Sequence, residues 1–214
     1  MGINLGLYDV FANIVPGLLY SFFLFELTKL FNIKIPYVEQ SSLVTITGLI
    51  VISFVLGHIF NRPSYNLWYR IIEKYQKSRI IALQDLRKFN PSINYDFLPE
   101  EAETLFAIIR HHDIQLAEKI DAFRANCIML RNISFGFLLL AIVPIVYLVR
   151  DGFSWEYLIY LLGSVLFSLL AARRAIDYIR WFYREIFRDA RNYGTNLSEV
   201  LKISISKTKA KVGK

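Results

Sequence analysis

Five arginines recur on one face of a helix that the sequence predicts over residues 173–193, RRAIDYIRWFYREIFRDARNY. At 100° per residue these arginines fall within about 80° of one another; they are Arg173, Arg180, Arg184, Arg188 and Arg191. The opposite side of the same helix is apolar and carries Ile176, Ile179, Tyr183, Ile186 and Ala190. The pattern therefore predicts a helix with one basic face and one packing face.

The planar guanidinium group can bind a phosphate or a carboxylate through two parallel hydrogen bonds, which lysine cannot do. Four of the five arginines, Arg180, Arg184, Arg188 and Arg191, lie eight or more residues beyond the expected end of the fourth membrane span at Ala172. They form a candidate binding site for a cytoplasmic partner protein or a nucleotide signal. In the alternative interpretation the arginines meet anionic lipid headgroups, at about 1 kcal/mol each.

Three further candidates are polar residues inside apolar runs, namely Asn13, Glu26 and His58. Polar and ionisable groups inside a bilayer are costly, so each is a functional candidate until a partner is found. Glu26 has Lys29 three residues further on, and it can pair with that lysine or reach the interface. His58 lies close to the end of its run, where we expect a hydrogen-bonded structural histidine rather than a proton relay.

Catalytic signatures are absent from the sequence, which has no P-loop, no dinucleotide-binding glycine pattern, no G-x-S-x-G and no HExxH. A single cysteine, Cys127, excludes a Cys-based zinc site, and three histidines make a metal cluster unexpected. The adjacent His111 and His112 point about 100° apart on a helix and cannot easily bind one metal together. His112 is expected in the core. We expect no enzymatic activity and no cofactor.

The elements that position these residues are four apolar runs in a chain that is 55% hydrophobic: residues 10–30, 43–60, 133–149 and 153–172. A bilayer core of about 30 Å needs about 20 helical residues. The sequence therefore predicts an all-α integral membrane protein with four transmembrane helices. Pro16 is expected to bend the first span. Ser53 and Gly57 form a small-xxx-small pair that allows another helix to approach closely.

A helical cytoplasmic domain is expected between the second and third spans, with helices near residues 64–89 and 99–130. An apolar stripe from Leu105 through His112 to Leu130 predicts one unbroken helix that continues into the third span. The predicted organisation has five parts. They are an N-terminal transmembrane hairpin (1–60), the cytoplasmic helical domain (61–131), a second transmembrane hairpin (132–172), the arginine-rich helix (173–193) and a disordered basic tail (194–214).

The distribution of basic residues predicts the orientation of the chain. Of 25 lysines and arginines, 11 lie in residues 61–131 and 11 in residues 173–214. Because cytoplasmic segments are rich in Lys and Arg, we expect both of these segments and both termini on the cytoplasmic side of a cell inner membrane. This bias accounts for the formal net charge of +7, so direct nucleic-acid binding is not expected.

Short motifs add a resemblance. The motifs that carry it are Tyr8-Asp9-Val10-Phe11, Ile14-Val15-Pro16-Gly17, Phe123-Arg124 and, just before the third span, Arg131-Asn132. With its four-span architecture, the chain resembles small membrane proteins of prokaryotic antiphage defence loci. These include the membrane subunit of Kiwa systems and the transmembrane proteins of CRISPR and cyclic-oligonucleotide systems. No catalytic or binding residue of those families can be assigned to positions in this chain.

The resemblance implies an oligomeric membrane protein that works with a cytoplasmic partner or opens the membrane on a signal. We expect a defence effector or pore controlled through its cytoplasmic domain, and the alternative is a non-enzymatic scaffold that recruits a defence partner. Four spans enclose no pore, and Asn13, Glu26 and His58 need polar partners within the bilayer. These considerations predict a homo-oligomer, most simply a tetramer.

Overall fold

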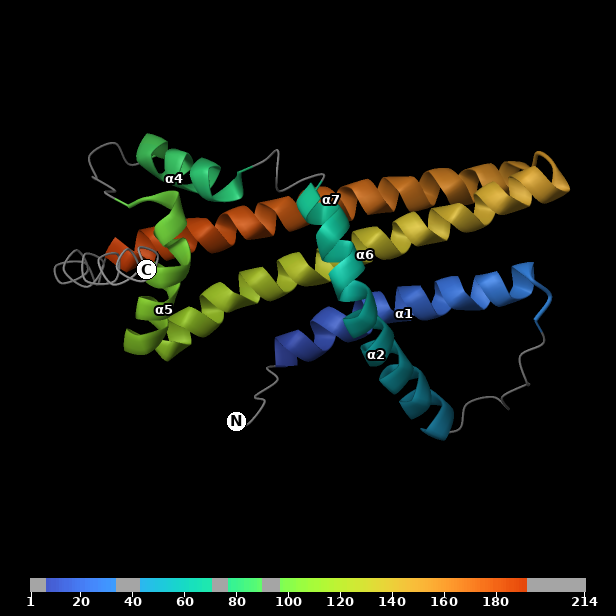
Figure 1. Ribbon diagram of the computed structural model, residues 1–214, viewed down its shortest axis with the longest axis horizontal. Coiled ribbons are helices and arrows are strands. Elements are labelled where there is room, and N and C mark those ends of the chain that lie inside the picture. Colours follow the sequence, from blue (N-terminus) through green and yellow to red (C-terminus); the bar gives the residue numbers. More distant parts are fainter. Residues whose placement is uncertain (1–6, 34–42, 71–76, 90–96, 192–214) are drawn as a thin grey trace, which may run out of the picture. The chain divides into compact units, whose positions relative to one another are not determined.

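The computed structural model describes residues 7–33, 43–70, 77–89 and 97–191, and every regular element in them is helical (Figure 1). The elements are α1 (Leu7–Leu30), α2 (Leu43–Trp68), α4 (Ser78–Phe89), the 3-10 turn η2 (Pro99–Glu101), α5 (Ala102–His112), α6 (Ile114–Asp151) and α7 (Trp155–Ala190). The expected all-α class is confirmed.

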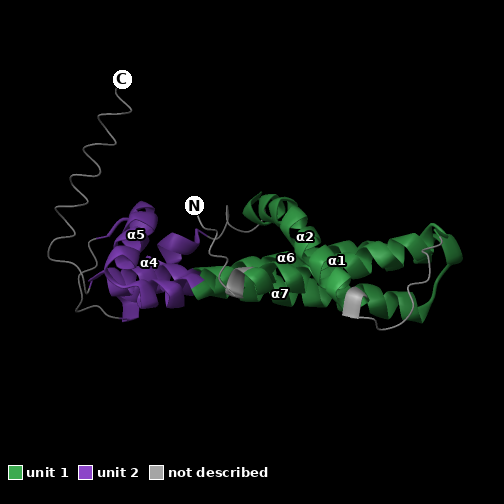
Figure 2. Cartoon of the chain, turned by 90° about the horizontal axis from the view of Figure 1, so that it is seen from below, with its two compact units in different colours: residues 1–76, 122–179 green, residues 77–121, 180–214 purple. Residues whose placement is uncertain are grey.

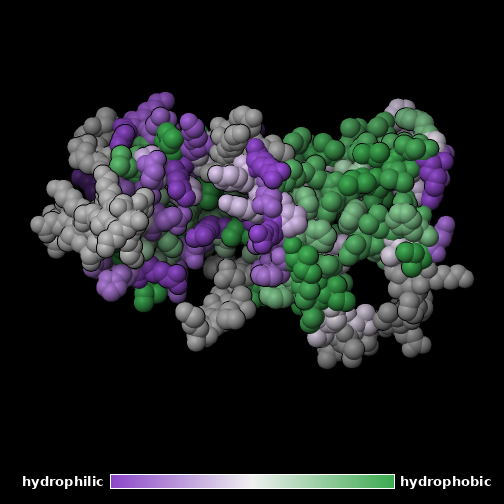
Figure 3. All heavy atoms as spheres, viewed as in Figure 1, coloured by the Kyte–Doolittle hydropathy of each residue, from purple (hydrophilic) through white to green (hydrophobic). Residues whose placement is uncertain are grey.

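Four of these helices are long and apolar enough to cross a membrane. The candidate spans are Val10–Leu30, Thr45–Trp68, Ile114–Asp151 and Trp155–Ala190. Figure 3 shows hydrophobic side chains covering the surface over α1 and the hairpin of α6 and α7. The structure thus supports the predicted multi-pass membrane protein. The hairpin turns at Gly152, which has a φ of +89° that suits glycine.

The chain divides into two compact units (Figure 2). Unit 1 contains residues 1–76 and 122–179, and unit 2 contains residues 77–121 and 180–214. Both α6 and α7 therefore begin in one unit and end in the other. Within the segment 61–131, which the sequence assigns to a cytoplasmic domain, the part that groups with unit 2 is residues 77–121.

In unit 1, α2 crosses α1 at a point where the two backbones nearly touch (Figure 1). A Cβ atom added to Gly17 would lie 1.7 Å from the carbonyl oxygen of Ser53, and one added to Gly57 would lie 2.0 Å from that of Asn13. The hydroxyl oxygens of Ser21 and Ser53 are 3.4 Å apart at the same crossing. The close approach predicted from Ser53 and Gly57 is confirmed, and the approaching helix is α1.

One part of the core of unit 1 lies where α1 packs on α6, and another lies where Trp68 of α2, Cys127 of α6 and Ala175 of α7 meet. Phe23 of α1 packs with Leu140 and Val143 of α6. Near the middle of α1, the rings of Tyr20 and Phe60 have centroids 4.5 Å apart. These contacts give the three helices α1, α2 and α6 a common buried interior.

Unit 2 has its own apolar core. Leu105 and Ile109 of α5 are fully buried, as are Ile186 and Phe187 of α7. Phe106 meets Phe182 edge to face with ring centroids 5.5 Å apart. Two other members of the apolar face predicted on α7, Tyr183 and Ala190, are also buried, whereas Ile176 and Ile179 in unit 1 are half-buried.

The predicted helix over 64–89 is wrong. The second span continues through Pro63 to Trp68 as part of α2, and α4 starts only at Ser78, after Lys77 with a φ of +40°. A proline is tolerated when neighbouring helices and side chains satisfy the backbone carbonyl that it leaves free. The apolar spacing over 64–89 combined residues from two separate helices.

The predicted unbroken helix from 99 to 130 is also wrong. Asp113 adopts an extended conformation (φ −142°, ψ 98°) between α5 and α6. Its carboxylate accepts a hydrogen bond of 2.9 Å from the backbone N–H of Leu116, as an N-cap residue does. His112 ends α5 and is exposed rather than in the core, as is His111. The continuous helix that enters the third span starts at Ile114.

Candidate functional site

The arginine face lies near the end of α7. Arg180 and Arg184 are half-buried, whereas Arg188 and Arg191 are exposed. Arg188 forms ion pairs with Glu185 and with Asp189, and the distance to Asp189 is 3.0 Å. Because two carboxylates already face Arg188, its guanidinium carries less free positive potential than the spacing of the arginines suggests.

Glu26 is paired within its own helix. Its Oε1 accepts a hydrogen bond of 2.9 Å from Lys29 Nζ, and the same ammonium lies 4.3 Å from the ring centroid of Phe25. The Lys29 side chain is 52% exposed, so the pair can reach the membrane interface. The structure is consistent with the simpler interpretation of Glu26, in which its charge is satisfied locally.

Asn13 and His58 lie near the crossing of α1 and α2 and differ in burial. Asn13 is half-buried and its backbone carbonyl faces Gly57. His58 is exposed on α2. Glu26 is 13 residues along α1 from Asn13, which is about 20 Å at 1.5 Å per residue. The structure does not gather these three residues into one site.

A different polar cluster is buried in unit 1. Tyr20 of α1 donates a hydrogen bond of 2.7 Å to the backbone carbonyl of Asn132 in α6. Asn132 Nδ2 donates to Asn61 Oδ1 of α2 at 3.3 Å, and Ser64 Oγ of α2 donates to the carbonyl of Arg131 at 3.3 Å. These five residues, from three helices, are called the polar junction below.

Arg131 is the charged member of the polar junction and is only 8% exposed. Its guanidinium donates to Asn61 Oδ1 and lies 5.2 Å from the ring centroid of Tyr65. Its Nε is buried without a hydrogen-bond partner, and none of the described carboxylates pairs with it. Asn132 Oδ1 is likewise buried and unpaired. A buried charge without an ionic partner is costly, so the junction has the electrostatic character of an anion site.

Sequence reasoning missed the polar junction because its members are far apart in the chain. Tyr20 and Asn132 are separated by 112 residues, and Asn61 and Arg131 by 70. One local signal was present. Polar pairs, Asn61-Arg62 and Arg131-Asn132, stand at the ends of the second and third apolar runs, where two adjacent spans can bring them to one depth.

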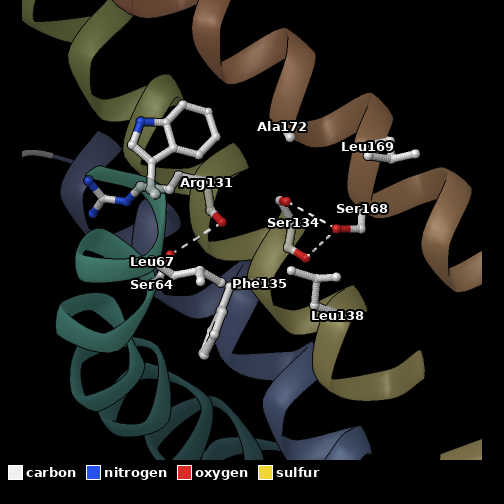
Figure 4. Close-up of a pocket in the computed structure, with 10 residues that line it drawn as sticks. Ser64, Leu67, Arg131, Ser134, Phe135, Leu138, Ser168, Leu169 and Ala172 are labelled. Carbon is white, nitrogen blue, oxygen red and sulfur yellow. Dashed lines mark hydrogen bonds between the residues drawn. The ribbon is translucent and has the colours of Figure 1, made fainter. Parts of the chain in front are cut away.

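Next to the polar junction is an apolar cavity of about 170 Å³ between α2, α6 and α7 (Figure 4). Ser134 and Ser168 face each other inside it, and Ser168 Oγ donates a hydrogen bond of 2.9 Å to the carbonyl of Ser134. The side chain of Arg131 extends away from this serine pair in Figure 4. The two serine hydroxyls are thus hydrogen-bonded to each other's residue, and the Arg131 guanidinium points away from them, so the rest of the cavity wall is apolar.

The residues that the structure describes contain no group of three or more His, Cys, Asp or Glu side chains that could hold a metal ion. Comparison with known proteins adds no assignment, since the chain matches no protein-family model, no curated protein and no solved structure. The polar junction, the neighbouring cavity and the arginine face are therefore judged on their own chemistry.

Proposed function

We propose that this chain is an inner-membrane protein of a prokaryotic antiviral defence system and acts as an oligomeric membrane effector or pore. In this proposal, unit 2 and both termini lie in the cytoplasm, and a signal or partner that binds unit 2 controls the membrane-spanning unit. The defence context is supported by the resemblance of the chain to small membrane proteins of antiphage loci. The mechanism of control is supported by the course of α6 and α7.

The observation that carries this proposal is that two membrane-spanning helices also build the core of unit 2. α6 has 38 residues and passes from unit 2 into unit 1 after Asp121, and α7 has 36 residues and passes from unit 1 into unit 2 after Ile179. Each helix crosses the unit boundary without a break in its helical conformation, so we expect a displacement of α6 or α7 in unit 2 to shift the attached span. Binding at unit 2 thereby gains a direct mechanical route into the bilayer.

An oligomer fits this mechanism because four helices from one chain are too few to enclose an aqueous pore. The outer face of α2 offers apolar side chains to lipid or to another copy, among them Ile46, Val51 and Ile59, each more than half exposed. We propose a tetramer as the simplest closed assembly. A native mass of one 25.0 kDa chain in mild detergent would contradict it.

The experiment breaks the helical link without touching either core. Ala122, the first α6 residue of unit 1, is half-buried. Proline inside a helix costs about 3 kcal/mol and removes one backbone hydrogen bond, so Ala122→Pro should uncouple the units, while Ala122→Ser keeps the helix. Cells that carry the native locus are challenged with phage, and membrane potential is followed with a dye.

In the effector proposal, the wild type and Ala122→Ser depolarise the membrane on infection, and Ala122→Pro inserts normally but does not depolarise it. If cells with the wild type keep their membrane potential throughout a productive defence response, the protein is not a membrane effector. If Ala122→Pro depolarises as strongly as the wild type, control does not pass through α6.

The second candidate is a membrane scaffold that recruits a cytoplasmic defence partner. It is favoured by the separate core of unit 2, whose helix α7 also carries the arginine face. A triple Arg→Lys variant at Arg180, Arg184 and Arg188 keeps the charge but removes the planar fork. If these arginines bind phosphate or partner carboxylates, the variant should insert normally and lose partner binding or activity.

The matched control is a double Arg→Lys variant at Arg173 and Arg174, both exposed and nearer to the apolar run of α7. This control should retain partner binding in a pull-down from the native locus. If the triple variant also retains both binding and activity, the arginine face serves as a lipid anchor, as in the alternative interpretation.

A further inference from the structure

The cavity beside the polar junction reaches the surface of unit 1 within the membrane-spanning part of the chain. Its apolar wall comes from Leu67, Trp68, Phe135, Leu138 and Leu169. Two of these residues, Leu138 and Leu169, are 41% and 63% exposed, so the wall continues onto the lipid-facing surface. A flexible apolar molecule in the bilayer can therefore enter the cavity from the side.

The sequence places this cavity at a defined depth. Arg131 stands two residues before the apolar run that starts at Ile133, and Leu138 lies seven residues beyond Arg131, about 10 Å along α6. The exposed rings of Tyr65 and Tyr69 stack with centroids 5.8 Å apart, and such amphipathic rings gather at headgroup level. The cavity thus starts near the headgroups and extends into the hydrocarbon.

The charge at the headgroup end of the cavity lacks a counter-ion. Arg131 is more than nine-tenths buried, its Nε has no hydrogen-bond partner, and none of the described carboxylates forms an ion pair with its guanidinium. An anion at this level would compensate the charge. A phosphate group can do so because guanidinium binds phosphate oxygens through directed hydrogen bonds, and phosphate is the anionic group of phospholipid headgroups.

We propose that unit 1 binds one anionic phospholipid, with a segment of one acyl chain in the cavity and the headgroup phosphate paired with Arg131. A free anion would leave the apolar cavity empty, and a zwitterionic phospholipid carries a cation beside its phosphate, so it would compensate the charge of Arg131 less than an anionic lipid does. The adjacent positions of Arg131 and the cavity on α6 suit a ligand that carries both groups in one molecule. This inference concerns lipid binding and is independent of the proposed defence role.

The test is native mass spectrometry of the full chain in mild detergent, titrated with phosphatidylglycerol, phosphatidylcholine or inorganic phosphate. The wild type should retain one phosphatidylglycerol with an affinity about fivefold or more above that for phosphatidylcholine, as expected for one arginine near an anionic headgroup. Inorganic phosphate should neither bind detectably nor compete. Equal affinities for the two lipids overturn the proposal, and competition by phosphate shows an anion site without lipid specificity.

Variants separate the two halves of the site. Arg131→Gln should bring the preference for phosphatidylglycerol close to onefold, whereas Arg62→Gln, an exposed arginine at the end of the second apolar run, should keep it. Leu169→Trp extends a side chain over the cavity from an exposed position and should abolish retention of the lipid. If Leu169→Trp retains lipid like the wild type, the acyl chain does not occupy the cavity. The comparison of lipids on the wild type decides the proposal even if a variant fails to fold.

Discussion

At the scale of single residues, the tightest constraint in unit 1 is the glycine contact between α1 and α2. A Cβ atom at Gly57 would lie 2.0 Å from the carbonyl oxygen of Asn13, which is backbone and cannot move aside alone. Gly48 lies in the same helix and has nothing within 4 Å of the equivalent position. The sequence could predict the small residues on α2, but it could not say that α1 was the partner, because that depends on the three-dimensional crossing.

We therefore predict that Gly57→Ala lowers stability by about 1–3 kcal/mol, the usual cost of forcing extra volume into a packed contact. Gly48→Ala should be neutral or stabilising by up to about 1 kcal/mol, since alanine is the better helix former. Thermal unfolding of both variants in the same detergent provides the measurement. Equal behaviour of the two alanines would show that the helices do not approach closely at Gly57.

The local sequence around Arg131 does not mark it as a site residue. In the sequence it is one of several basic residues at span ends, and its position matches the positive-inside pattern. Only the packing of α1, α2 and α6 shows that it is buried and without a carboxylate among the described residues. Arg188, by contrast, is a predicted site residue because it aligns with other arginines on α7, and the structure places it against Glu185 and Asp189.

At the scale of elements, the spans were predictable because twenty consecutive apolar residues have few alternatives. The helices of unit 2 were harder to predict from the sequence than the spans were. Asp113 sits inside an apolar pattern that continues across it, and helical periodicity alone does not reveal a cap. Aspartate is nevertheless a common N-cap residue, so Asp113 was the local signal for a helix start at Ile114.

For this element we predict that Asp113→Ala destabilises unit 2 by about 1 kcal/mol, since it removes the acceptor for the Leu116 N–H. Asp113→Ser retains a capping oxygen, so it should lower the stability of unit 2 by only a few tenths of a kcal/mol. Hydrogen exchange of the amides at the start of α6 reports the change directly. Unaltered protection in Asp113→Ala would mean that α5 and α6 do not need this cap.

At the scale of the whole molecule, the division into two units follows from hydropathy combined with continuous helices. The long apolar runs form unit 1. Two of the helices that contain these runs, α6 and α7, also extend into unit 2 and contribute to its separate core. The sequence predicts helical segments that continue both the third and the fourth span beyond the membrane, and in the structure α6 and α7 each belong to both units. The sequence alone could not place the unit boundaries at residues 76, 121 and 179, because these boundaries depend on which side chains pack together.

The central claim is that four spans cross the membrane with unit 2 on the cytoplasmic side, and cysteine labelling in intact cells tests it most directly. Cys127, the natural cysteine, is buried, so new cysteines can be compared against a silent background. A membrane-impermeant thiol reagent should label Gly152→Cys, in the exposed turn between α6 and α7. It should label Lys88→Cys, on the exposed end of α4 in unit 2, only after the cells are permeabilised. Labelling of Lys88→Cys in intact cells, with Gly152→Cys protected, would contradict this topology.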